Sequence, residues 1–273
     1  MCIRDRWWSI SRYLSSDENP RQWAITDLDP EKTPECLAGD LADHFTSITN
    51  LADRLELGQI PRSRNGDGLV RLLEEKQVAG RLKKFKKPQS RVDGDLPRAI
   101  VNQSAEALAR PLTLIYNYCF LERQWPTIWK RETVVPIPKI PTPGGFNDIR
   151  PISMTPLWSK LLESYIAGYT LIETSQNWKT NQHGGRKGSS TDHVLIQMWD
   201  TILSELDSAS DKSKAAVLCG IDFSKSFSRC SYQLILDSYI DLGASQWVLD
   251  MHAAFLVGRS MQVKVGNVLS TPR

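Results

Sequence analysis

Residues 216–229 read AVLCGIDFSKSFSR, and this stretch decides the fold. Small and apolar residues fill positions 216–221, a length and composition typical of a buried β-strand. Asp222 follows directly, and the polar residues after it lead toward a helix near Ser231. A carboxylate at the end of a strand can face a cleft, where burial requires a metal ion or a cationic partner. The alternative for Asp222 is a helix cap or a surface turn, and this stretch alone does not separate the two.

Length and composition limit the classes of protein that the chain can belong to. Its 273 residues are enough for one large domain, or for a core domain with an extension. The net charge of +3 does not indicate a nucleic-acid binder, so only local clusters of charge could do so. Five cysteines without CxxC spacing predict reduced thiols in an intracellular protein of the cytoplasm or nucleus. No apolar run is long enough to span a bilayer, so we expect no membrane partner.

The first eighty residues read as an extension that becomes helical. A helix is expected from Asp40 as its N-cap, because Leu41, Phe45, Ile48, Leu51 and Leu55 form one apolar face. A loop at Pro61 to Gly68 and a second helix over Leu69 to Val78 should follow.

A basic run then begins at residues 81–91, RLKKFKKPQSR. Lysines around an aromatic residue can lie along a phosphate backbone, and each contact adds salt-dependent affinity. The alternative is a solvated surface with no ligand. The candidate nucleic-acid-binding residues of this run are Lys83, Lys84, Lys86 and Lys87.

The middle of the chain predicts helices and a hairpin. Two helices are expected over residues 96–110 and 111–123, the second opened by Pro111 in its first turn. The alternation of β-branched residues and prolines over residues 133–140 predicts an edge strand. Gly144 and Gly145 form a turn, so Lys139 and Arg150 should lie near one another on a hairpin. They are either ordinary surface cations or a pair aimed at phosphate.

The remaining elements surround a glycine-rich loop, residues 181–191, NQHGGRKGSST. The order GxxxxGK[ST] is absent, which excludes an NTPase P-loop, although Arg186 and Lys187 remain candidate phosphate contacts. Helices are expected at residues 156–172, from a Thr191 cap to Leu206, and at 231–242 and 244–257. A final hairpin should turn at residues 266–267.

From about Lys83 onward the chain resembles the reverse transcriptase of non-LTR (LINE-type) retrotransposons. Several blocks match in the family's order, which is more specific than any single block. The matching blocks are KKPQSRVDGDLP (86–97), WPTIWK (125–130), PIPK (136–139), RPIS (150–153), SKLLE (159–163), QHGGRKGSST (182–191) and DFSKSFS (222–228).

The chain also departs from the family pattern. Gly185 stands where the family usually has Phe, Ser226 replaces Ala, and Ser228 replaces Asp or Asn. The family's Gly-x-Pro-Gln-Gly-Ser and Ala-Asp-Asp blocks would follow the last residue of this sequence. The resemblance therefore implies an N-terminal part of a polymerase that is inactive by itself.

The resemblance implies an α/β (α+β) fold, an incomplete right-hand polymerase with helical fingers and the first part of the palm. Residues 1–80 would be an N-terminal extension, residues 81–215 the fingers, and residues 216–273 the start of the palm. The implied partners are an RNA template, a DNA primer and deoxynucleoside triphosphates.

The same resemblance assigns roles in the site. Asp222 would be the catalytic carboxylate and, with the carbonyl of Phe223, a ligand of the two Mg²⁺ ions. The nucleotide would be bound by Lys139 and Arg150, by the backbone amides of Lys225 and Ser226, and by Phe227, whose ring would exclude a 2′-hydroxyl. The alternative for Phe227 is a core residue.

Two other functions stay open. A non-catalytic nucleic-acid-binding remnant would use the basic residues Lys83, Lys84, Lys86, Lys87, Arg186 and Lys187. A metal-dependent hydrolase built on Asp222 would need a further ligand, and His183 and His193 are better explained as surface or cap residues.

Overall fold

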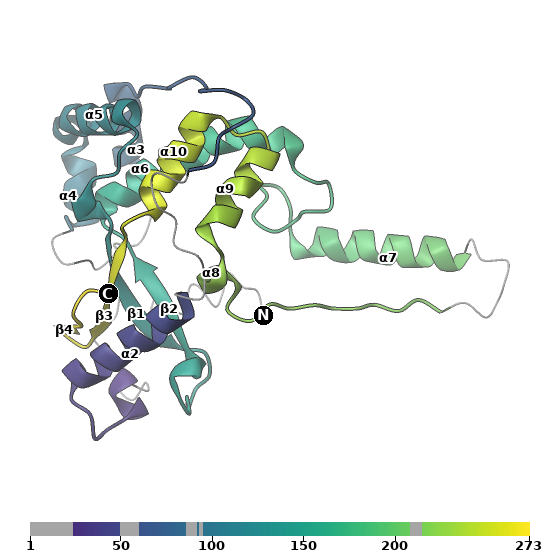
Figure 1. The fold of residues 1–273 in the computed structure, drawn as a ribbon, viewed down its shortest axis with the longest axis horizontal. Helices are drawn as coiled ribbons and strands as arrows, with labels where there is room; N and C mark the ends of the chain where they lie inside the picture. Colours follow the sequence, from purple (N-terminus) through teal and green to yellow (C-terminus); the bar gives the residue numbers. More distant parts are fainter. Residues whose placement is uncertain (1–23, 50–59, 86–91, 93–94, 208–214) are drawn as a thin grey trace.

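The computed structural model describes residues 24–49, 60–85, 92, 95–207 and 215–273. Over these ranges the chain has a mixed α/β fold, with helices packed together beside a four-stranded sheet (Figure 1). This confirms the α/β class, while the polymerase architecture and its boundaries stay predictions. The elements are η1 (Ile25–Leu28), α2 (Pro34–Thr49), α3 (Glu75–Lys83), α4 (Arg98–Gln103), α5 (Ala105–Glu122), η3 (Thr127–Trp129), β1 (Arg131–Pro138), η4 (Phe146–Asp148), β2 (Ile149–Met154), α6 (Leu157–Thr174), η5 (Ser175–Asn177), α7 (Thr191–Asp207), α8 (Ser226–Arg229), α9 (Tyr232–Asp241), α10 (Gln246–Leu256), β3 (Ser260–Val265) and β4 (Val268–Leu269).

The strand order is β2-β1-β3-β4, and β1 pairs antiparallel with β2 and parallel with β3. The prediction that β1 is an edge strand is therefore wrong. On β1, the residues that pair with β3 are Arg131 to Val134, whereas Pro136 lies farther along, opposite Pro151 of β2. The prolines thus occupy the half of β1 that β3 does not reach, where a missing N–H breaks no bond to β3.

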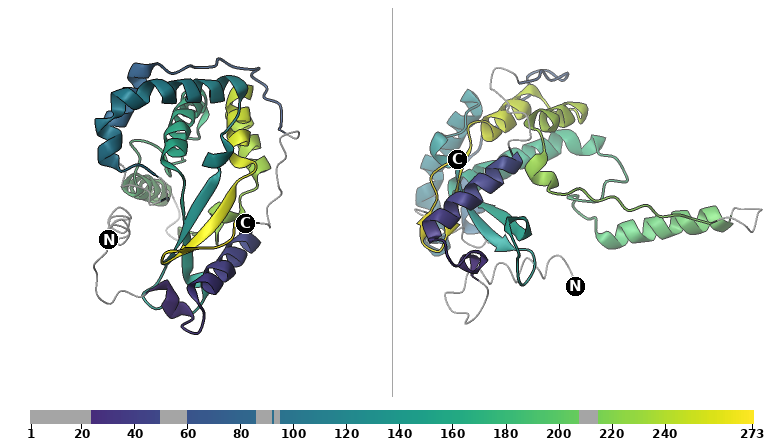
Figure 2. Two further views of the ribbon diagram at one scale, coloured as in Figure 1. Left: turned by 90° about the vertical axis from the view of Figure 1, so that its left-hand side faces the viewer. Right: turned by 60° about the horizontal axis from the view of Figure 1, so that its bottom comes forward.

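Helix α2 covers one face of this sheet (Figure 2). Its buried side chains, including Leu41 and Phe45, pack against Val134 and Val263. The helix begins at Pro34, so the prediction of an N-cap at Asp40 is wrong. A proline is favourable in a first turn, and the hydroxyl of Thr33 accepts the backbone N–H of Cys36 at 3.3 Å. The predicted face positions Leu51 and Leu55 lie outside the described residues.

The larger core is helical and is centred on Trp247 of α10. The indole is fully buried, its N–H donates to the carbonyl of Phe120 at 2.9 Å, and the two rings meet edge to face at 5.5 Å. Phe120 belongs to α5, which runs through an exposed Pro111 as one helix, so the predicted break there is wrong. Burial of neighbours such as Leu112 and Tyr116 offsets the hydrogen bond that the proline cannot make.

A strap, residues 60–74, crosses the start of α10. The carbonyls of Gly66 and Asp67 accept the backbone N–H groups of Gln246 and Trp247 at 2.9 and 3.0 Å. The predicted loop at 61–68 is confirmed, but the predicted helix over 69–78 begins only at Glu75. Residues 69–74 of the strap form neither helix nor strand, and the side chain of Asn117 in α5 pairs with the backbone of Leu73 there.

The contact between α6 and α10 makes stability depend on pH. His252 of α10 lies 2.8 Å from the hydroxyl of Thr170 and its ring lies 4.5 Å from that of Tyr239. Burial lowers the pKa of His252 from 6.5 to about 4. Between these values the unfolded chain binds the proton and the folded chain does not, so stability falls as pH falls from about 6.5 to 4.

We expect a loss of about 3 kcal/mol in the free energy of unfolding across this window, measured by urea titration at several pH values. In the variant His252→Gln, the free energy of unfolding should depend much less on pH. The variant His193→Gln, changed at a surface residue, should keep the pH dependence of the parent chain. Equal slopes in His252→Gln and the parent chain would contradict the assignment.

The predicted buried strand at residues 216–221 is wrong. No described strand pairs with this segment, and the side chains of Val217 and Ile221 are 92% and 80% exposed. A strand forms only where a neighbour supplies the hydrogen bonds, and an apolar run does not provide that neighbour. The segment follows α7, which projects from the body of the molecule and buries none of its residues (Figures 1 and 2). None of the described helices is both long and apolar enough to cross a lipid bilayer.

Candidate functional site

The hairpin of β1 and β2 positions the two predicted phosphate-binding cations. Arg150 of β2 stands opposite Ile137 of β1, two positions before Lys139. The backbone N–H of Lys139 donates to the carbonyl of Asp148 at 2.7 Å and closes the hairpin. Residues 146–148 form η4 at its tip, which carries Phe146 and Asn147. The predicted hairpin is therefore confirmed, and the Arg150 side chain is exposed on it.

Lys225 reaches this hairpin from a segment remote in sequence. Its Nζ donates to Oδ1 of Asn147 at 2.8 Å, and Nζ of Lys139 donates to the backbone carbonyl of the same Asn147. Lys225 has a φ of 55°, the left-handed conformation, at the turn into α8. The ammonium groups of Lys139 and Lys225 are thus both hydrogen-bonded to Asn147. Since like charges in proximity raise the local positive potential, this surface favours an anion.

The predicted catalytic segment lies just before Lys225. Asp222 and Phe223 are exposed in an extended segment and not at the tip of a strand. Ser226 begins α8. Phe227 is 99% exposed, so the alternative that it is a core residue is wrong.

The donor chemistry of this segment fits Mg²⁺ only in part. Asp222 offers a carboxylate and Phe223 a backbone carbonyl, which are oxygen donors of the kind that Mg²⁺ takes. Each ion requires about six oxygens, and the described residues gather no group of three acidic, histidine or cysteine side chains that could hold a metal ion. The segment can therefore supply part of a metal site but not two complete ones.

His44 is a neighbour of this site that the sequence did not indicate. It lies on α2, and its ring centroid is 5.5 Å from that of Phe146 at the hairpin tip. Burial lowers the pKa of His44, and the charges of Lys225 and Lys139 lower it further. The sequence pattern places α2 in an extension, so only its packing on the sheet reveals the proximity.

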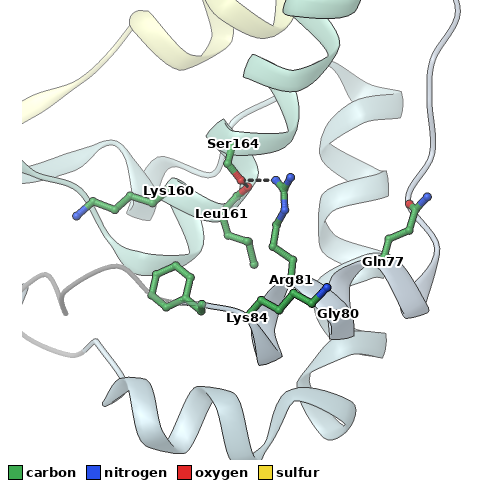
Figure 3. A pocket seen from close by; sticks show the side chains of 8 residues that line it. Gln77, Gly80, Arg81, Lys84, Lys160, Leu161 and Ser164 are labelled. Atoms are coloured by element: carbon green, nitrogen blue, oxygen red, sulfur yellow. Dashed lines mark hydrogen bonds between the residues drawn. The ribbon is translucent and has the colours of Figure 1, made fainter. Parts of the chain in front are cut away.

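The basic run at 81–91 contributes to a separate groove of about 580 Å³ between α3 and α6 (Figure 3). Lys84 lines it, together with Arg81, the first residue of the run, and Lys160, which was not predicted. The guanidinium of Arg81 lies 4.2 Å from the centre of the Tyr165 ring and donates to the hydroxyl of Ser164 at 2.6 Å. The other lining residues are Gln77, Gly80, Phe85 and Leu161.

The other lysines of that run are placed differently. Lys83 forms an ion pair with Glu106, so it is engaged within the fold. Lys86 and Lys87 lie outside the described residues. Of the four predicted lysines, Lys84 is the one that the structure places on the groove.

The glycine-rich loop forms a second hollow, of about 370 Å³, lined by Arg186 and Lys187. His183 lies 2.9 Å from the hydroxyl of Ser189, and Nδ1 of His193 accepts the backbone N–H of Ser190 at 3.1 Å. These contacts agree with the surface and cap roles expected for the two histidines. The cap of α7 is Ser190, whose hydroxyl accepts the His193 N–H at 3.4 Å, and not Thr191 as predicted.

No family model matches this chain, and no curated protein matches its sequence. Two features of the chain bear on its function: the ordered sequence blocks, and the cationic hairpin site formed by Lys139, Asn147, Arg150 and Lys225.

Proposed function

We propose that this chain is part of an RNA-directed DNA polymerase of the non-LTR retrotransposon kind, and that its cationic hairpin site binds the triphosphate of a deoxynucleotide. The hydrogen bond between Lys225 and Asn147 carries the proposal. It joins the block DFSKSFS to the hairpin that holds PIPK and RPIS. In the family, these blocks bind the same nucleotide. A resemblance of sequence alone does not require the blocks to be in contact, so their contact in the structure is independent support.

The chemistry of the site suits a triphosphate. The ammonium groups of Lys139 and Lys225 can face phosphate oxygens, and an exposed guanidinium at Arg150 can contact two oxygens at once. Asp222 lies three residues before Lys225, so a bound triphosphate would be near its carboxylate. When bound, Mg²⁺ would neutralise charge on the reacting phosphate, and further carboxylates are needed to complete its site.

We expect Lys139→Ala and Lys225→Ala each to weaken binding of a deoxynucleoside triphosphate about tenfold, measured by calorimetry without metal. Adding salt should weaken binding by the parent chain more than binding by either variant. Lys179→Ala, at an exposed lysine elsewhere, is the matched control and should bind like the parent. Unchanged affinity in both site variants would contradict the proposal.

The groove between α3 and α6 favours a second candidate, a non-catalytic nucleic-acid-binding protein. Arg81, Lys84 and Lys160 supply positive charge there and Phe85 an aromatic ring, a combination that suits a single strand. In this case RNA would bind and depend on Lys84, while the deoxynucleotide would not bind at the hairpin. RNA and nucleotide titrations of the parent and of Lys84→Ala separate the two functions.

A further inference from the structure

The tip of the hairpin is contacted by basic side chains from three elements. His44 of α2 packs its ring against Phe146, while Lys139 of the hairpin and Lys225 before α8 both donate to Asn147. Phe146 and Asn147 are consecutive, so the three side chains are held around one short segment. Two are fixed by hydrogen bonds and the third by ring packing.

The three basic groups lack an obvious purpose in the folded protein by itself. Gathering positive charge costs free energy, and a histidine beside two lysines is disfavoured in its charged form. The two carboxylates of α2 nearest to His44 in sequence are paired elsewhere, Asp43 with Arg273 and Asp40 with Lys32. Among the described residues, the groups whose charge lowers the pKa of His44 are Lys139 and Lys225. The carboxylate at the hairpin tip, Asp148, accepts the backbone N–H of Gly144 at 3.0 Å.

We infer that His44 is a third contact for the phosphates bound at Lys139 and Lys225, and that it takes up a proton when they bind. This inference rests on the proposed function and adds to it a residue from the N-terminal helix. A triphosphate carries several negative charges, so its binding favours the charged form of His44. The protonated imidazole then faces an anion as well as two cations. Binding should consequently strengthen as pH falls.

The test measures the affinity of the full chain for inorganic tripolyphosphate, without metal, at pH 5.5 and 7.5. The variant His44→Phe keeps a ring against Phe146 but cannot take up a proton. The ligand's own phosphates also titrate near pH 6, so the informative quantity is the ratio of parent to variant affinity, in which that contribution cancels. We expect a ratio of about ten at pH 5.5 and near one at pH 7.5, because the imidazole of the parent adds a charged hydrogen bond to the phosphates only where it is protonated.

A second variant tests whether altered packing at position 44 explains the change in affinity. His44→Gln is polar and does not titrate, so it should lose the same pH dependence as His44→Phe. His193→Gln is the matched control, and its affinities should follow those of the parent. If the ratio is the same at both pH values for His44→Phe and His44→Gln, the inference is overturned.

The outcome also separates this inference from the proposed function. A deoxynucleoside triphosphate that binds through Lys139 and Lys225 but is indifferent to His44 at pH 5.5 would overturn the inference alone. Tripolyphosphate binding that shows the His44 ratio, with no binding of deoxynucleotide, would support a polyphosphate site and reject the proposed function.

Discussion

Asp222→Ala is expected to reduce RNA-templated DNA synthesis by about a thousandfold in a protein that continues this chain with the family's later palm blocks. Asp222 is the only acidic residue of the block DFSKSFS, so no neighbour within the block can replace its carboxylate. The side chain is exposed, and its removal should leave the folded structure unchanged. The loss should therefore appear in synthesis and not in stability.

Primer extension on an RNA template, with synthesis quantified per folded protein, measures this effect. Asp200→Ala is the matched control, because Asp200 is an exposed aspartate of α7 outside the matched blocks. Synthesis that persists in Asp222→Ala would reject the assignment of this residue.

Gly68→Ala should lower the free energy of unfolding by about 3 kcal/mol, measured by urea denaturation. Gly68 has a φ of 76°, and a Cβ built there would lie 2.3 Å from Cβ of Ser245. Ser245 caps α10, accepting the N–H of Val248, and its own N–H donates to Glu173 at 2.8 Å. Alanine would thus combine backbone strain with displacement of the cap or of the strap.

Gly66→Ala provides the matched control for this clash. Its φ of 70° is similar, but a Cβ there would meet no atom within 4 Å. We expect a loss of about 1 kcal/mol, from backbone strain alone. Equal losses at the two glycines would mean that the contact with Ser245 does not matter.

Local patterns in the sequence predicted much of the fold. The helices around Gly243 and the hairpin that turns at Gly266 follow from turn residues and apolar periodicity, and both are present. The β1–β2 hairpin follows from the same kind of signal, and it carries Lys139 and Arg150 as expected.

The errors arose where distant contacts override local preference. Pro111 does not end α5, because buried neighbours hold the helix together across it. β1 is central because β3, more than a hundred residues later, pairs with its proline-free half. The apolar run at 216–221 is not a strand because no described strand pairs with it.

The candidate site was predicted in part for the same reason. The sequence blocks contain Lys139, Arg150 and Lys225. The roles of Asn147 and His44 follow only from the contacts of the hairpin tip with α2 and with the turn before α8. No spacing in the sequence connects His44 with residues a hundred positions away.

Helix α7 also affects the handling of the protein. The apolar residues Ile196, Trp199 and Leu203 of this helix are each more than half exposed, and Val217 and Ile221 add to this surface. Apolar area of this kind promotes association between molecules in water. The solubility of the purified chain should therefore be limited by α7 and the segment after it, even though the helical core around Trp247 is well packed.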